Sequence, residues 1–262
     1  MLAAVDWHVI WQRIFHPDHI FFRALYTTVY IAVIAQAMGV LLGLLAALMR
    51  SSKLWPLRFL SGVYVLIFRG TPLLVQIFFV YYGANLMLGF TLIPNSLNLG
   101  LFSLDGAIVA GILALGVNEG AYMREIIRAG IDSIESGQME AAKSLGMRYG
   151  LAMRRIILPQ AARVIVPPLG NEFNNMLKTT SLVFTIGVYE MFSDAEIHYS
   201  NTFQPVEFFL AVAFWYLVLT GIWSVIQAAI ERRLAASEQG DRLTFRERLA
   251  GAWAPAGVFV RR

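Results

Sequence analysis

A few charged residues lie within apolar stretches of this 262-residue sequence, where they could do chemistry. An ionisable group inside a membrane is costly, so it normally faces a cavity, a substrate or a partner. Arg69 could bind a substrate carboxylate, because arginine forms bidentate hydrogen bonds with carboxylates. Glu172 could bind the amino group or a basic side chain of a substrate. The alternative to such a substrate-binding site is the active site of an intramembrane enzyme that uses Arg69, Glu119 and Glu172.

Arg69 is followed closely by Thr71 and Pro72, and this order predicts a broken helix. Proline lacks a backbone donor, so the helix should break near the centre of the bilayer. Arg69 would then meet a substrate, pair with Glu119 or hold the break in place. The sequence leaves these three roles open.

A second polar group lies on the helix predicted over residues 164–189. Three- and four-residue spacing places Asn171, Asn174, Asn175 and Lys178 on one face, with Glu172 about 100° away from Asn171. Placing such a polar face against lipid is costly, so we expect it to line a pore. The alternative is that it forms hydrogen bonds between subunits. The substrate-path candidates are Arg69, Thr71, Gln76, Asn118, Glu119, Asn171, Glu172, Asn175 and Lys178.

The composition is that of a membrane protein. Hydrophobic residues make up 58% of the chain and charged residues 15%, against about 25% charged residues in soluble domains. The chain has no cysteine, which excludes disulfides, thiolate metal sites and a cysteine nucleophile. Its four histidines show no metal-binding pattern such as His-Glu-x-x-His, so we expect neither a metal site nor a catalytic site.

The order of the apolar segments predicts an all-α membrane protein with five transmembrane helices. A helix needs about 20 mostly apolar residues to cross the hydrocarbon core. The predicted spans are residues 24–49, 59–83, 106–127, 164–189 and 208–230. The predicted division of the chain is an external or interfacial segment, a membrane domain and a cytoplasmic tail, over residues 1–23, 24–230 and 231–262.

Lysine and arginine are distributed unevenly over the connections between these spans. They are frequent in residues 50–58, 128–163 and 232–262, whereas residues 84–104 and 190–205 contain none. Cytoplasmic connections carry the excess of basic residues, so the N-terminus should lie outside and the C-terminus in the cytoplasm. This topology and anionic lipid account for the basic tail, and we expect no nucleic-acid partner.

The connection over residues 130–160 is too polar to span a membrane and too patterned to be a slack linker. Helix formers from Glu140 to Leu145 are followed by Gly146, which suits a short helix with a glycine cap. A second short helix is predicted over residues 149–157, stopped by Pro159. Two such helices are shaped to dock on a partner, and an ordinary surface loop is the alternative.

This connection resembles the signature of permease subunits of binding-protein-dependent ABC importers. The residues that match the signature at its fixed spacing are Glu140, Ala141, Ala142, Gly146, Ile156, Leu158 and Pro159. Residues 69–76, 119–130 and 177–182 are similar to the polar amino acid uptake branch of that family. Thr179 departs from this branch, which usually has an acidic residue there, so no Lys–Asp contact is expected.

The resemblance implies a set of partners as well as a fold of the type I importer kind. The chain would form half of a translocation path in the bacterial inner membrane, facing a second permease that is identical or homologous. The chain contains no Gly-Lys pair and therefore no P-loop, so ATP and Mg²⁺ would bind to separate ATPase subunits and this chain would hold no cofactor. An extracytoplasmic binding protein would deliver an amino acid.

The resemblance also gives a mechanical role to residues 130–160, which we refer to as the coupling loop. Ala141, Ala142 and Leu145 would seat in a groove on the ATPase, Gly146 would allow close backbone approach, and Glu140 would cap the helix or pair with a basic group. An opine, a sulfur-containing amino acid or another small zwitterion is the alternative cargo. A membrane scaffold without transport is the weakest alternative, because a scaffold has no need of the polar helix face.

Overall fold

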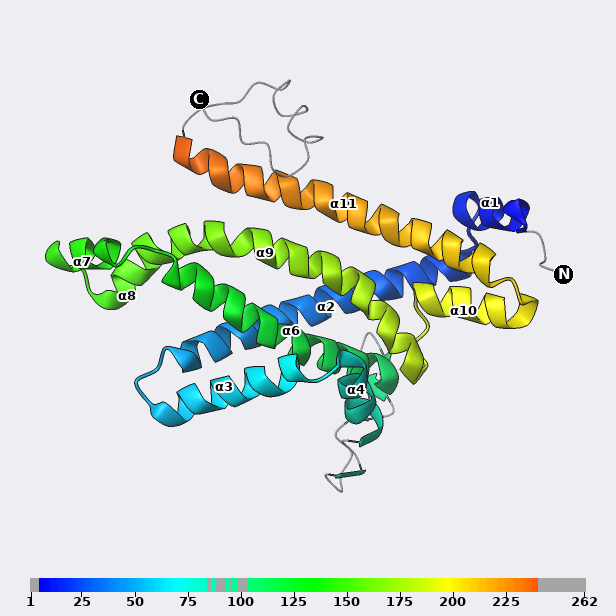
Figure 1. Cartoon of the computed structure of the whole chain (residues 1–262), viewed down its shortest axis with the longest axis horizontal. Coiled ribbons are helices and arrows are strands. Elements are labelled where there is room, and N and C mark those ends of the chain that lie inside the picture. The colour runs from blue at the N-terminus through cyan, green and yellow to red at the C-terminus, as the bar shows by residue number, and fades with distance from the viewer. Residues whose placement is uncertain (1–4, 84–85, 88–92, 95, 99–102, 240–262) are drawn as a thin grey trace.

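The computed structural model describes most of the chain, and the structural statements below concern these residues: 5–83, 86–87, 93–94, 96–98 and 103–239. They form an elongated helical bundle whose long helices run lengthwise (Figure 1). At one end lie two short helices, α7 (Ser136–Ser144) and α8 (Tyr149–Ala152), and at the other lie α1 (Trp7–Phe15) and α10 (Met191–Thr202). Much of the predicted cytoplasmic tail, residues 231–262, falls outside the described part.

Two aspartates begin the first two helices. The carboxylate of Asp6 accepts a hydrogen bond from the backbone nitrogen of His8 at 2.9 Å, which starts α1. Asp18 starts α2 (His19–Arg50) in the same way, accepting from the backbone nitrogen of Phe21 at 2.8 Å. Such caps satisfy backbone donors that have no partner within the helix. The first predicted span therefore lies within a longer helix.

The second predicted span is broken. α3 (Trp55–Gly70) ends before Thr71 and Pro72, and α4 (Leu73–Phe78) follows and continues as the π-helix η1 (Phe79–Gly83). The two helical parts are bent by 106°. The break falls where proline predicts it, because its ring cannot donate the hydrogen bond that would continue α3.

A short hairpin leads from this bent segment into the central helix. β1 (Ser96–Asn98) pairs antiparallel with β2 (Ser103–Asp105). The Asp105 carboxylate then accepts from the backbone nitrogen of Ala107 at 2.8 Å and starts α6 (Gly106–Asp132). α6 contains the third predicted span and packs against most of the other long helices.

Small residues let α6 lie directly against α2. A Cβ atom added at Gly39 of α2 would lie 2.7 Å from the Cβ of Glu119 and 3.3 Å from the backbone nitrogen of Gly120. A Cβ added at Gly43, one turn later, would lie 2.9 Å from the backbone nitrogen of Arg124. Glycines at this spacing allow membrane helices to approach closely. This contact positions Glu119.

Replacing Gly43 by leucine is expected to destabilise the protein by about 1–3 kcal/mol or more, because the added side chain would overlap the α6 backbone. Thermal unfolding in detergent, followed by the loss of the monodisperse gel-filtration peak, measures the effect. The matched control is Gly62→Leu in α3, where an added Cβ has no neighbour within 4 Å among the described residues. Equal melting temperatures for the two variants would contradict the prediction.

The chain continues as a helix across Pro159. α8 is followed by the π-helix η2 (Met153–Ile157) and directly by α9 (Leu158–Thr179). The prediction that Pro159 stops the second short helix is wrong, because proline is tolerated in the first turn of a helix, where its missing N–H leaves no bond unmade. The fourth predicted span, residues 164–189, is divided between α9 and the 3-10 helix η3 (Thr180–Ile186).

Residues 190–205, expected as a plain connection, form α10 before α11 (Pro205–Gln239) begins. Glu190 caps α10, and one of its carboxylate oxygens accepts a hydrogen bond from a backbone nitrogen of the first turn at 2.8 Å. The other oxygen accepts from the hydroxyl groups of Tyr216, at 2.9 Å, and Thr28, at 3.3 Å. This buried carboxylate therefore ties α10 to α11 and α2.

Three helices of the described chain are long and apolar enough to cross a membrane: α2, α6 and α11 over Pro205–Leu234. The bent segment of α3, α4 and η1 would make a fourth span. α9 does not meet the same measure, because asparagines and charged residues interrupt its apolar sequence. The expectation of five spans thus holds for three straight helices and one bent segment, and α9 is a polar helix packed against α6 and α11.

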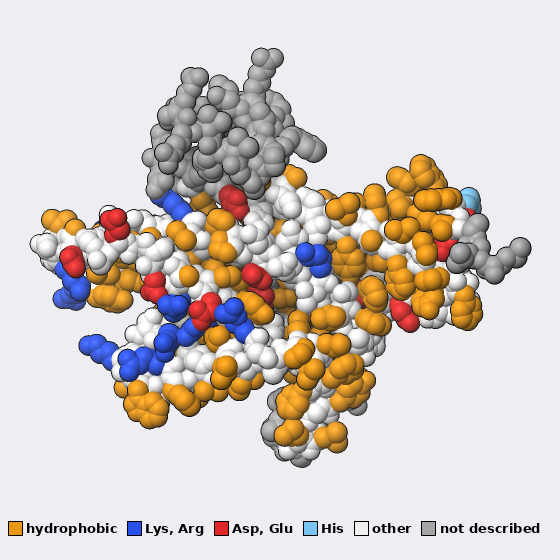
Figure 2. Space-filling view, viewed as in Figure 1, with side chains coloured by type: hydrophobic (Ala, Val, Ile, Leu, Met, Phe, Trp, Pro, Cys, Tyr) orange, Lys and Arg blue, Asp and Glu red, His pale blue; other side chains and the backbone are white. Residues whose placement is uncertain are grey.

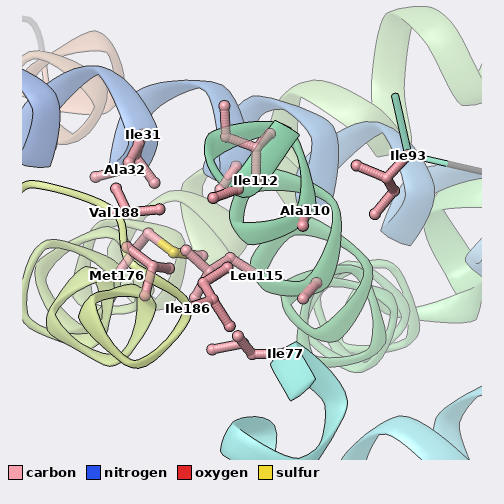
Figure 3. Close-up of a cluster of buried hydrophobic side chains, with 14 of the residues drawn as sticks. Ile31, Ala32, Ile77, Ile93, Ala110, Ile112, Leu115, Met176, Ile186 and Val188 are labelled. Carbon is pink, nitrogen blue, oxygen red and sulfur yellow. The ribbon is translucent and has the colours of Figure 1, made fainter. Parts of the chain in front are cut away.

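An apolar core lies where α2, α4, α6 and η3 meet (Figure 3). Ile31 and Ile77 are 0% exposed, Leu115 is 1% exposed and Ile186 is 3% exposed. The side chains of Leu115, Ile186 and Ile77 converge in the close-up. This core holds the start of α4 against α6, next to the polar residues at the bend.

Charged and apolar side chains occupy different parts of the surface. Figure 2 shows Lys and Arg side chains gathered toward the end of the bundle that carries α7 and the turn between α2 and α3. Large apolar side chains stand exposed along the helices, including Leu66 at 73%, Leu217 at 69% and Val225 at 71%. Lipid or a partner subunit would cover such residues in a membrane, and water would not.

Candidate functional site

A polar cavity of about 560 Å³ lies between the start of α4, α6 and α9. It brings together most of the predicted substrate-path residues, namely Thr71, Asn118, Glu119, Glu172, Asn175 and Lys178. The cavity lining also includes residues that were not predicted, among them Pro72, Leu115, Tyr122 and Met176. Tyr122 follows Glu119 at three-residue spacing, a usable signal. Leu115 and Met176 are apolar, and nothing in the sequence separates them from core residues.

Glu172 and Lys178 present free charged groups to this cavity. Among the described residues, neither side chain has a hydrogen-bond or ion-pair partner. Unpaired polar groups on a cavity wall are groups that a bound ligand can satisfy. A carboxylate and an ammonium group on the same wall match the two opposite charges of a zwitterion.

Glu119 lies deeper in the wall and is held by α2. Its carboxylate accepts a hydrogen bond from the side-chain nitrogen of Gln36 at 2.9 Å, and Glu119 is 6% exposed. Two acidic side chains, Glu119 and Glu172, therefore share the cavity with one lysine.

Gln76 and Asn118 are hydrogen-bonded at the bend between α3 and α4. The side-chain nitrogen of Gln76 donates to the carbonyl oxygens of Phe68, at 2.9 Å, and Thr71, at 3.1 Å. The side-chain nitrogen of Asn118 donates to the same Phe68 oxygen at 2.8 Å and to the side-chain oxygen of Gln76 at 3.0 Å. The structure thus places Gln76 outside the set of residues that line the cavity, with its side chain bonded to the bend, and its place on the path stays a prediction.

Arg69 lies over the ring of Tyr122, with its guanidinium carbon 5.0 Å from the ring centre. In the described part of the chain no carboxylate lies within ion-pair distance of Arg69, so the alternative of pairing with Glu119 is wrong. An arginine over an aromatic face is stabilised by a cation–π interaction. Arg69 is exposed and borders the bend, outside the set of residues that line the cavity.

Asn171 does not join Asn175 and Lys178 at the cavity, although helical spacing places the three on one face. Its side-chain oxygen accepts from the side-chain nitrogen of Gln227 in α11 at 3.1 Å. The neighbouring carbonyl oxygen of Gly170 accepts from the indole nitrogen of Trp223 at 2.8 Å. α11 therefore packs on this part of α9, and the Asn171 side chain is hydrogen-bonded to α11.

The coupling loop ends α7 with a glycine, as its sequence predicts. Gly146 has φ of +80°, a left-handed conformation that favours glycine, and its backbone nitrogen donates to the carbonyl oxygen of Lys143 at 2.9 Å. Leu145 is 83% exposed, and Glu140 and Ala141 are also exposed. Ala142 is only 1% exposed, so Leu145 and Ala141 are the apolar residues of the predicted set that this chain presents at its surface.

The helical membrane bundle, the polar cavity within it and the exposed apolar residue on a basic loop together define a membrane transport subunit. The chain belongs to the family of binding-protein-dependent transport system inner membrane components, which it matches over residues 39–236.

Three similar proteins agree with this assignment. The chain is 41% identical to an arginine transport system permease protein of Corynebacterium glutamicum, over 87% of this chain and 72% of that protein. It is 39% identical to a probable amino-acid permease protein of Bacillus subtilis, over 86% of this chain and 96% of that protein. A crystal structure of an amino acid ABC transporter with histidines has a chain that is 38% identical, with a TM-score of 0.74 over 88% of this chain and all of that chain.

Family membership decides between the transporter and the intramembrane enzyme, which the sequence left open. The chain is an inner-membrane permease component of an ABC importer, and ATP hydrolysis takes place in a partner subunit, so the intramembrane enzyme is excluded. The partners that such a component requires are an ATPase, a second permease and a substrate-binding protein. The fold is that of a type I importer permease.

Proposed function

We propose that the chain is the transmembrane subunit of an ATP-driven amino acid importer and forms half of its translocation path. The observation that carries this proposal is the cavity in which the free side chains of Glu172 and Lys178 face the same space. The relatives named for arginine and for amino acids support the cargo class. An opine or another small zwitterion carries the same pair of charges and is the second candidate.

Within the cavity, Glu172 binds the amino group or the basic side chain of the cargo. Lys178 offers an ammonium group to the carboxylate of the cargo. Asn175, which lies between Glu172 and Lys178 in the sequence, supplies a hydrogen-bonding amide to the same cavity. Glu119 adds a second acidic group, so an amino acid with a cationic side chain fits best. Thr71 borders this space at the bend and gives a hydroxyl group to the opposite wall.

The coupling loop docks on the ATPase, which binds ATP and Mg²⁺, and this chain holds neither. Leu145 is the apolar anchor of this contact, and Gly146 lets the two backbones approach. Movement of the ATPase passes through α7, α8 and η2 into α9, which carries Glu172 and Lys178. The helical chain across Pro159 supports this route, because η2 leads directly into α9, which carries the cavity residues.

The N-terminus lies outside the cell and the C-terminus in the cytoplasm. The basic end of the bundle, which carries α7, supports this orientation (Figure 2). α1 lies at the opposite end, and α11 runs from that end toward α7 (Figure 1). The second permease is a copy or a homologue of this chain, the binding protein docks at the α1 end, and lipid surrounds the helices.

Uptake by the intact importer tests this function. The complex is reconstituted into liposomes with its binding protein on one side, and labelled arginine, glutamine, cystine and octopine are supplied in turn. Accumulation of an amino acid that requires hydrolysable ATP on the coupling-loop side is the expected result. Accumulation of the opine alone would favour the second candidate. The absence of ATP-dependent uptake of every compound, with a folded complex, would contradict the proposal.

A further inference from the structure

We propose that Gln76 and Asn118 are positioning residues that fix the bend between α3 and α4, and we refer to the pair as the clasp. They set the place of the cavity wall and do not select the cargo. The inference rests on the proposed role of the cavity in transport, but its test measures the bend itself. It gives both residues a role other than the contact with cargo that the sequence predicts, although Asn118 does line the cavity.

The bend creates a need for hydrogen bonds. A helix leaves its last carbonyl groups without partners, and Pro72 cannot donate to them because it has no N–H. In a membrane these groups find no water, so other protein groups must satisfy them. The carbonyl oxygens of Phe68 and Thr71 are both in this position, and the side-chain nitrogen of Gln76 reaches both.

Asn118 of α6 supplies the other hydrogen bonds of the clasp. Asn118 donates to the carbonyl oxygen of Phe68 and also to the side-chain oxygen of Gln76. The same Gln76 nitrogen lies 2.8 Å from the hydroxyl oxygen of Thr71, so its two hydrogens are shared among three acceptors, and that hydroxyl in turn donates to the carbonyl oxygen of Ile67 at 2.8 Å. The network thus links the end of α3, the start of α4 and the middle of α6.

Burial leaves the clasp little freedom to bind a cargo. Gln76 is 7% exposed and Asn118 is 8% exposed. Both polar atoms of the Gln76 amide and the donor of the Asn118 amide are already hydrogen-bonded within the protein. A buried amide with satisfied groups stabilises one geometry, and a partly satisfied network would not. Gln76 therefore acts on the cavity through Thr71 and Pro72, which line it next to the bend, whereas Asn118 lines the cavity and has its side-chain nitrogen committed to the bend.

Distances across the bend, measured by pulsed electron paramagnetic resonance, test the clasp. The chain has no cysteine, so nitroxide labels on Leu60→Cys and Phe79→Cys are unique within it. The intact importer in lipid nanodiscs should give a narrow distance distribution. Gln76→Glu keeps the size of the side chain but cannot donate to the two carbonyls as a carboxylate, and it should shift or broaden the distribution. Asn118→Leu should do the same.

The matched control is Asn175→Ala, which removes a side chain from the same cavity without touching the bend. It should leave the distances unchanged. In uptake assays the clasp variants should slow every cargo by the same factor, whereas Asn175→Ala should change the relative rates of different cargoes. Unchanged distances in Gln76→Glu and Asn118→Leu would overturn the clasp. A change in cargo preference without a change in distance would show instead that these residues contact the cargo.

Discussion

Replacing Leu145 by aspartate is expected to abolish ATP-driven uptake while the membrane domain stays folded. Leu145 is 83% exposed at the end of α7 and contributes little to the core. We expect Leu145 to be an anchor of the interface, and loss of an anchor residue costs about 2–4 kcal/mol of binding, which weakens docking roughly 30- to 1000-fold. Copurification of the ATPase with the tagged chain measures the effect directly.

The matched control for this prediction is Leu54→Asp. Leu54 is 62% exposed and is the residue that precedes α3, outside the coupling loop. This variant should retain the ATPase. A second variant, Gly146→Val, should also lose the ATPase, because valine is strained at φ of +80°. Retention of the ATPase by Leu145→Asp would remove the coupling loop from the docking surface.

Replacing Glu172 by glutamine is expected to change which cargoes are transported. The substitution keeps the size of the side chain and removes its charge, so binding to a positively charged group weakens by about 1.5–3 kcal/mol, roughly 10- to 150-fold. Uptake of arginine should fall by such a factor relative to uptake of glutamine. Competition between the two labelled amino acids in proteoliposomes gives the ratio.

Asn171→Ala is the matched control for Glu172. Asn171 precedes Glu172 on α9 but is hydrogen-bonded to Gln227 of α11, so its loss should leave the ratio of arginine to glutamine uptake unchanged. Equal ratios in the wild type and in Glu172→Gln would remove Glu172 from the path. If the ratio of arginine to glutamine uptake differs from the wild-type ratio in both Glu172→Gln and Asn171→Ala, the preference depends on the packing of α9 and not on the charge.

The sequence predicts the coupling loop and the helix break well, because both depend on local chemistry. Gly146 can adopt a left-handed conformation at little cost, and Pro72 cannot continue a helix, whatever surrounds them. The signature of the loop adds fixed spacing to this chemistry. Pro159 is the exception, since proline both ends and begins helices and the choice depends on the chain that follows.

The side chains that line the cavity are less predictable, because tertiary contacts decide which polar groups stay free. The sequence places Asn171 and Asn175 on one helical face, yet Asn171 is hydrogen-bonded to α11 and only Asn175 lines the cavity. Gln76 is polar and close to a break, which suits either a cargo contact or a backbone contact. Periodicity gives the direction of a side chain on its helix but not the neighbour that it meets.

The buried carboxylate of Glu190 is the part of the molecule that the sequence does not reveal. Its partners, Thr28 and Tyr216, lie far from it along the chain. The short segment that follows it reads as a connection, because it lacks a long apolar run. No local pattern marks an acidic residue that starts a helix and joins two others at the same time.

Isolation of the tagged chain from its native membranes in mild detergent tests the central claim most directly, with mass spectrometry of the proteins that copurify. We expect an ATPase subunit with the wild-type chain and with Leu54→Asp, and its loss from Leu145→Asp. The same measurement shows whether the second permease is this chain or a homologue. If no ATPase copurifies under several mild conditions with a folded and abundant chain, the assignment of the coupling loop, and with it the proposed importer mechanism, is wrong.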